Sequence, residues 1–221
     1  MAVTMPMFPL GTVLVPGAVL PLHVFEPRYR AMVADCLAAE EPEFGVVLIE
    51  RGFEVGGGDV RRAVATVARI ASVGELDDGR YALVTHGTRR IRIVSWLPDA
   101  PYPRAEVEDW PEPEPTGDLA PQRDAAVRQL RSLLALASEL GLDGAPDPDQ
   151  VAQDPVVASY HLAAIAPIGS DDRYRLLAAP DAEQRYTVLD GLFAEVADVL
   201  RFRLQTESGD PFEGLGGLDE T

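Results

Sequence analysis

Three histidines and one cysteine are the first candidates for nucleophilic, acid–base or metal chemistry among the 221 residues of this sequence. His23 lies in an apolar run, His86 precedes a glycine, and His161 falls within a predicted helix. None of them has a second histidine at helical spacing, and the HExxH, CxxC and GxSxG patterns do not occur. We therefore predict no metal and no cofactor. A Ser/His/Asp triad stays open, because its members meet only in the folded chain.

The single cysteine excludes an intrachain disulfide and is typical of a reducing compartment. Cys36 falls on the apolar face of a predicted helix, so we expect a buried, unreactive thiol there rather than a nucleophile. The sequence has no run of 18 apolar residues and no basic segment followed by a hydrophobic one at its start, so it predicts neither a membrane span nor a signal peptide. Together these features predict a cytoplasmic protein.

All 19 basic residues are arginine, and lysine is absent. A phosphate-binding loop of the Walker type requires a lysine. Arginine cannot replace a lysine base, because its guanidinium does not deprotonate in proteins. The triple glycine Gly56-Gly57-Gly58, within the segment 51–59, is accordingly predicted to be the mobile tip of a hairpin rather than a phosphate cradle.

The formal charge of −17 is unevenly distributed. Residues 1–104 hold 11 arginines and 12 acidic residues, whereas residues 105–221 hold 8 and 24. The second part therefore repels nucleic acid and anionic membranes. One basic cluster, Arg89, Arg90 and Arg92, has two interpretations. It could contact an anion, a nucleic acid or another ligand, or it could be an exposed strand face whose arginines pair with the many acids.

The elements that must position these groups are organised around one corner. Apolar residues run up to Phe25, and Glu26-Pro27 then stops a strand and suits the start of a helix. After it, apolar residues recur at helical spacing, at Tyr29, Met32, Val33, Cys36 and Leu37. Glu26 and Arg28 are thereby brought together at a strand-to-helix corner. We expect them to form a fixed ion pair or a helix cap, with an acid–base role as the alternative.

The same corner carries a family resemblance. The segments 7–10, 13–17 and 21–29, followed by 44–48, 66–70, 78–81 and 87–93, resemble in order the N-terminal, substrate-binding domain of Lon proteases. The positions that carry this signature, which we expect to be structural, are Pro9, Leu10, Pro16, Pro21, Leu22, His23, Phe25, Glu26, Arg28, Tyr29, Gly45, Gly79, Arg80, Gly87 and Arg90. The resemblance implies a PUA-like β-barrel followed by helices. Full Lon proteases cleave with a serine–lysine dyad. This chain cannot form such a dyad, because it has no lysine.

The resulting fold class is α+β, in four parts. Residues 1–110 read as a barrel domain of five or six short strands and one helix, with strands at 44–49, 63–73, 81–85, 88–97 and 104–110, a hairpin at Asp77-Asp78-Gly79 and a turn at His86-Gly87. Residues 111–120, rich in proline and glutamate, read as a linker. Residues 121–205 read as a helical subdomain, with helices at 122–140, 156–165, 170–178 and from 181 onward, and residues 206–221 as a disordered acidic tail.

Binding is the function class that these observations favour. The resemblance implies a bacterial, stand-alone, non-catalytic domain that engages unfolded or extended polypeptide segments, as an adaptor or modulator of proteolysis with a separate protease as a partner. We expect the site in a groove between barrel and helices, or along a free strand edge. One alternative is an RNA-binding PUA-like module anchored by Arg89, Arg90 and Arg92. Another is a small hydrolase that uses a histidine.

Overall fold

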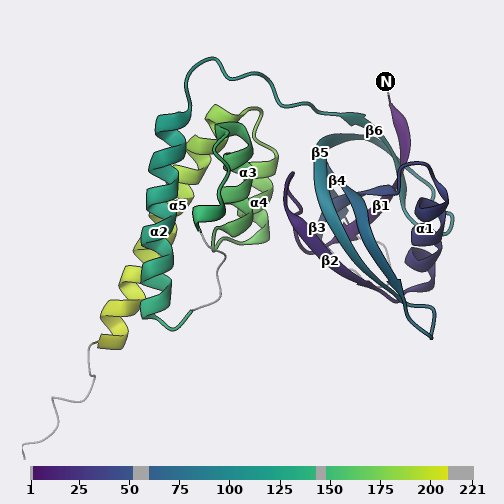
Figure 1. Cartoon of the computed structure of the whole chain (residues 1–221), viewed down its shortest axis with the longest axis horizontal. Coiled ribbons are helices and arrows are strands. Elements are labelled where there is room, and N and C mark those ends of the chain that lie inside the picture. The colour runs from purple at the N-terminus through teal and green to yellow at the C-terminus, as the bar shows by residue number, and fades with distance from the viewer. Residues whose placement is uncertain (1, 52–59, 143–147, 209–221) are drawn as a thin grey trace, which may run out of the picture.

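The strands of the computed structural model, which describes residues 2–51, 60–142 and 148–208, form one six-stranded sheet (Figure 1). They are β1 (Val3–Leu10), β2 (Val19–Val24), β3 (Glu43–Arg51), β4 (Val60–Glu75), β5 (Tyr81–Leu97) and β6 (Arg104–Asp109). Their order is β2-β5-β4-β3-β1-β6, and β6 also pairs with β5. Only the β1–β3 pair is parallel among these strands. Because β6 pairs with both β1 and β5, the strands β1, β3, β4, β5 and β6 form a closed ring of pairings. Strand β2 lies outside this ring and pairs with β5.

Alternation along β1 divides the interior of this unit into two apolar clusters. Met5 and Met7 lie in one cluster with residues of β3, β4, β5 and β6. Phe8 and Leu10, which point the other way, pack beneath helix α1 (Pro27–Ala38). The rings of Phe8 and Tyr29 lie 4.2 Å apart between centroids. The predicted helical face is confirmed for Tyr29, Met32, Val33 and Cys36, which are all buried. Leu37, which was predicted to lie on the same face, is instead exposed near the end of the helix.

Four helices follow the sheet: α2 (Ala120–Glu139), α3 (Pro155–Ile165), α4 (Ser170–Leu177) and α5 (Ala182–Ser208), with a short 3-10 turn, η1 (Pro148–Gln150), between α2 and α3. Helices α2 and α5 lie side by side, and α3 and α4 lie between them and the sheet (Figure 1). Their apolar stripes meet in a cluster that includes Leu130, Leu133, Leu189 and Phe193. None of the helices in the described ranges is long and apolar enough to cross a membrane.

The predicted helix starts are confirmed at two acidic caps. The side chain of Asp154 accepts a hydrogen bond from the backbone N–H of Val157 at 2.9 Å. Asp181 accepts one from the N–H of Gln184 at 2.7 Å. Each carboxylate satisfies a backbone donor that the first turn of the helix leaves without an intrahelical partner.

The structure corrects two predictions of local structure, the turn at His86-Gly87 and the start of the tail at residue 206. The predicted turn at His86-Gly87 is wrong, because β5 runs through both residues. Gly87 is instead a point of close backbone approach. Its N–H donates a hydrogen bond to the carbonyl of Ala18, and its carbonyl accepts one from the N–H of Gly17. Helix α5 continues three residues beyond 205, to Ser208, because nothing in its sequence breaks it before Gly209. The proposed hairpin tip at 52–59 and the tail from 209 to 221 lie outside the described residues.

Candidate functional site

The outer face of β2 presents a continuous exposed stripe. Val19, Pro21 and His23 alternate along the strand, and Phe25 follows at the same two-residue spacing. Val19 is 55% exposed and Phe25 is 56% exposed. On the neighbouring strand, Val84 lies directly opposite Pro21 and is also exposed. We call these five residues the β2 patch.

The opposite face of β2 holds this patch in place. Leu20, Leu22 and Val24 point inward and pack with the cluster under α1. In addition, the hydroxyl of Thr85 donates to the carbonyl of Leu20 at 2.9 Å. Within the described strands β2 pairs with β5 alone, so no described strand pairs with its second edge. The site is therefore an apolar face beside a free strand edge.

The corner after Phe25 fixes the end of the patch. The Nε atom of Arg28 donates to Oε2 of Glu26 at 3.1 Å, which confirms the predicted ion pair. The guanidinium of Arg28 also lies 4.5 Å from the ring centroid of Tyr29, whose side chain is buried. Glu26 occupies the N-cap position of α1 but makes no side-chain cap bond. The pair thus stiffens the corner rather than capping the helix.

The signature glycines are required by close contacts. A Cβ on Gly45 would come 2.5 Å from Sδ of Met7. A Cβ on Gly87 would come 2.3 Å from the carbonyl oxygen of Val15, which is too close for any side chain. Gly79 has a φ of +75° in the turn before β5, as the hairpin prediction requires.

The other signature residues outside the β2 patch, apart from Arg90, lie at the corner, in the strands or in the loops that join them. Arg80 donates to Asp78 at 2.6 Å across the turn that contains Gly79. Pro9 and Leu10 are buried at the end of β1, and Pro16 is half-buried in the loop before β2. Sequence reasoning treated the whole signature as structural. The structure instead places three of its members, Pro21, His23 and Phe25, on the exposed face.

The three arginines of the basic cluster do not share a surface. Arg89 donates to Glu43 at 2.6 and 3.0 Å and to Asp109 at 2.9 Å. The hydrogen bonds from Arg89 to Glu43 hold the pKa of the Glu43 carboxyl below its usual value. Arg92 is exposed, and its guanidinium lies 3.9 Å from the ring centroid of Trp110. Pairing with acids is thus confirmed for Arg89, whereas Arg90 does not lie on the exposed face at all.

Arg90 crosses from the sheet to the helices. It is only 3% exposed, and its Nη1 atom donates to the carbonyls of Leu177 and Ala179 at the end of α4, at 3.0 and 2.5 Å. Its Nη2 atom lies 2.9 Å from Oε2 of Glu112. Burial lowers the pKa of this guanidinium, and the acceptors around it compensate for its lost hydration.

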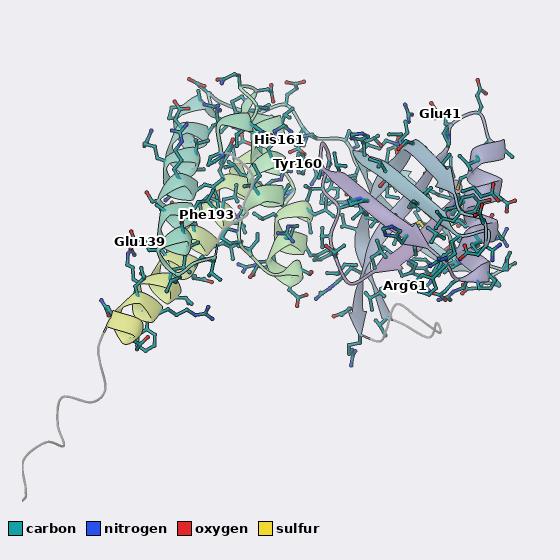
Figure 2. The ribbon with its side chains drawn as sticks, turned by 60° about the horizontal axis from the view of Figure 1, so that its bottom comes forward. Glu41, Arg61, Glu139, Tyr160, His161 and Phe193 are labelled. Atoms are coloured by element: carbon teal, nitrogen blue, oxygen red, sulfur yellow. The ribbon has the colours of Figure 1, made fainter. Side chains whose placement is uncertain are left out.

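Glu112 is the centre of this joint, although it belongs to the predicted linker. Both of its carboxylate oxygens accept from Nη2 of Arg185, at 2.9 and 3.0 Å, and the hydroxyl of Tyr160 donates to it at 2.5 Å. Arg185 is fully buried on α5. Figure 2 shows Tyr160 on the side of the helices that faces the sheet. The expected groove between sheet and helices is therefore filled at this point by a bonded network of side chains.

Sequence reasoning missed Glu112, Tyr160 and Arg185. The signal for Arg185 was its position one turn before Leu189, on the apolar stripe of α5. A charged residue on such a stripe requires a buried partner. Glu112 carried no comparable signal, because glutamate between prolines is also typical of exposed linkers.

The three histidines and the cysteine lie on different elements, with His86 directly opposite Val19 in the strand register. His23 is on the β2 patch and His86 is exposed on β5. His161 accepts the backbone N–H of Ala152 through Nδ1 at 3.2 Å, on α3 near the loop before β2. Burial raises the pKa of Cys36 to about 12, as expected for an unreactive thiol. In the ranges that the structure describes, no three His, Cys, Asp or Glu side chains gather as metal ligands would.

Comparison with known proteins places this arrangement in a family. Residues 4–189 match the family of the ATP-dependent protease La (LON) substrate-binding domain. The crystal structure of a Lon N-terminal domain protein from Xanthomonas campestris superposes with a TM-score of 0.63 at 30% identity, over 87% of this chain and 98% of that one. The N-terminal domain of a Mycobacterium avium complex Lon protease has the same fold, with a TM-score of 0.64 at 22% identity, over 86% of this chain and 98% of that one.

Full-length proteases are similar over part of their length only. Lon protease 2 of Herpetosiphon aurantiacus is 28% identical over 203 residues, which are 89% of this chain and 24% of that protein. Lon protease 2 of Myxococcus xanthus is 35% identical over 107 residues, which are 47% of this chain and 13% of that protein. The chain thus spans about a quarter or less of the length of the curated relatives it matches.

Proposed function

This chain belongs to the family of ATP-dependent protease La (LON) substrate-binding domains, and from that premise we propose that it binds extended polypeptide segments without chemically altering them. The match covers the region that these proteins use for recognition, and no protease or ATPase domain is detected in this chain. The absence of lysine agrees with this proposal, because neither a Walker loop nor a serine–lysine dyad can be built from the sequence.

The β2 patch is the observation that carries the proposal. An extended segment laid along β2 would place alternate apolar side chains against Val19, Pro21 and Phe25. Its backbone would pair with the free edge of the strand. Pro21 has no N–H to donate, so pairing would rest on the residues on either side of it. Recognition of this kind depends on exposed apolar residues in an extended chain, which an unfolded protein supplies and a folded one hides.

We assign the finer features on the same basis. The closed set of strand pairs is proposed to be a PUA-like barrel at residues 1–110. Residues 121–205 are proposed to form a helical bundle, joined to the barrel by residues 111–120. In the cytoplasm such a domain would serve as an adaptor or modulator of proteolysis that presents polypeptides to a separate protease.

Binding to a permanently unfolded probe tests this function. We expect a fluorescently labelled, reduced and carboxymethylated protein to bind the full chain, with the complex detected by fluorescence anisotropy. Phe25→Ser should weaken binding about tenfold, as for loss of an exposed aromatic contact. Val94→Ser, which alters a residue of similar exposure on β5 outside the β2 patch, should leave it unchanged. Equal effects of the two substitutions, or no binding of the probe to the unaltered chain, would refute the proposal.

A further inference from the structure

The second half of α5 borders an apolar groove away from the β2 patch. The groove has a volume of about 420 Å³. It is formed between α5, the end of α2 and the turn before α4, and its apolar walls include Leu134, Leu142, Pro167, Val196 and Val199. Leu142 is 53% exposed and Val199 is 54% exposed, so part of this apolar lining faces solvent. Helix α5 runs on beyond the end of α2 (Figure 1).

Phe202 projects from the same stretch of helix and does not fill this groove. Its side chain is 66% exposed, the largest exposed fraction among the large apolar residues that the structure describes. Phe202 is six residues from Val196, which places the two about 120° apart around the helix axis. The exposed ring of Phe202 thus lies on one side of Val199, and the apolar groove beside Val196 lies on the other.

Two opposite charges on α5 are equally spaced from Val199, one on each side of it along the helix. Glu195 lies four residues before it and Arg203 four residues after it, and both contribute to the rim of the groove. Both are exposed, and neither has an ion-pair partner among the described residues. If two α5 helices pack antiparallel about Val199, Glu195 of each copy meets Arg203 of the other. In the same register, Phe202 of each copy meets Val196 of the other.

We propose that this face of α5 is the interface of a homodimer, in which the occupant of the groove is Phe202 of a second copy of this chain. The contact is isologous, since every pairing occurs twice and is related by a two-fold axis through Val199. It therefore closes at two copies rather than growing into a fibre. The dimer leaves the β2 patch free, so each complex carries two polypeptide-binding surfaces.

A second copy fits this groove better than an unrelated apolar helix would. Glu195 and Arg203 carry opposite charges on one exposed face, equally spaced from the central Val199. An antiparallel copy neutralises both charges at once, whereas a parallel copy would set like charges side by side. The exposed aromatic ring and the hole that would receive it are both supplied by this chain.

Charge exchange tests the register of the proposed interface in the full chain. Sedimentation velocity over a range of concentrations should show a monomer–dimer equilibrium for the unaltered protein. Glu195→Arg alone and Arg203→Glu alone should each weaken the dimer about tenfold, because each sets like charges opposite one another twice. An equimolar mixture of the two variants should restore dimerisation, because the heterodimer has opposite charges at both positions.

Two further variants separate this interface from general effects on α5. Arg201→Glu changes an exposed arginine on another side of the same helix and should leave the dimer unchanged. Phe202→Ser should weaken it about tenfold or more, as expected for a central aromatic residue. The proposal would be overturned by a chain that stays monomeric up to about 1 mM, the concentration scale of the weakest specific complexes. It would also be overturned by a mixture of the charge variants that does not recover, or by an Arg201→Glu effect equal to that of Arg203→Glu. None of these outcomes depends on binding of the unfolded probe.

Discussion

Replacement of Glu112 by glutamine should uncouple the sheet from the helices. The carboxylate accepts from two buried guanidinium groups, those of Arg90 and Arg185, and from the hydroxyl of Tyr160. Glutamine keeps the shape but presents an N–H₂ group to donors, which leaves positive charge buried without a counter-charge. Removal of one member of a buried ion pair costs about 3–5 kcal/mol. We therefore expect Glu112→Gln to lower the free energy of unfolding by about 3 kcal/mol, near the low end because the Glu112 side chain is 19% exposed.

Urea unfolding measures this loss with two probes. Fluorescence of Trp110 reports on the joint, because its ring centroid lies 4.1 Å from Cζ of Arg90. Far-ultraviolet circular dichroism reports on the helices. Glu114→Gln is the matched control, because Glu114 is exposed in the same segment, and it should change stability by less than about 0.5 kcal/mol. If Glu112→Gln and Glu114→Gln have equal effects, the network does not stabilise the joint.

Three other consequences follow from single contacts. In the native protein, the thiol of Cys36 should react with a disulfide reagent at pH 8 at least about a hundredfold more slowly than in the unfolded chain, since its pKa is raised to about 12. Gly87→Ala should lower the free energy of unfolding by about 3 kcal/mol, because its Cβ would meet the carbonyl oxygen of Val15. The pKa of Glu43 is lower in the folded than in the unfolded state, so its contribution to stability is present above its ordinary pKa and is lost as the pH falls through the folded value. Glu43→Gln should therefore flatten the acid limb of a plot of stability against pH below the ordinary pKa of a glutamate, measured by urea unfolding at each pH.

The corner at Glu26-Pro27 could be predicted because its signals are local. Proline, the acid before it and the apolar spacing of α1 all act within a dozen residues, and the ion pair joins residues two apart. The caps at Asp154 and Asp181 were predictable for the same reason. The turn at His86-Gly87 was not, because a glycine that permits close backbone approach from Val15 looks identical in sequence to one that permits a turn.

The joint could not be predicted because its partners are far apart along the chain. Arg90 donates to carbonyls 87 and 89 residues away, and Arg185 reaches a carboxylate 73 residues before it. Backbone carbonyls have no signature in sequence. Although the family signature includes Arg90, nothing in the sequence showed that its side chain reaches the helices. The exposure of the β2 patch was equally hidden, because alternation predicts that a strand has two faces without telling which one the helix covers.

The β2 patch and the proposed dimer interface lie in different parts of the molecule. The β2 patch belongs to the sheet, whereas the groove beside Val199 belongs to the far part of the helices. The bonded joint at Glu112 lies between them and holds the two parts in one orientation. A dimer built through α5 would therefore hold its two patches at a fixed spacing and could bind two segments of one unfolded chain, which increases the effective affinity without any new contact.

Hydrogen exchange with a bound polypeptide is the most direct test of where recognition occurs. Amide exchange of the full chain, measured by mass spectrometry with and without a saturating unfolded probe, should slow in the segment 19–25 and not in residues 195–203 of α5. The backbone N–H groups on the free edge of β2 would then be paired with the ligand. Slower exchange confined to α5, or unchanged exchange at 19–25 when the probe is bound, would contradict the assignment of the β2 patch as the binding surface.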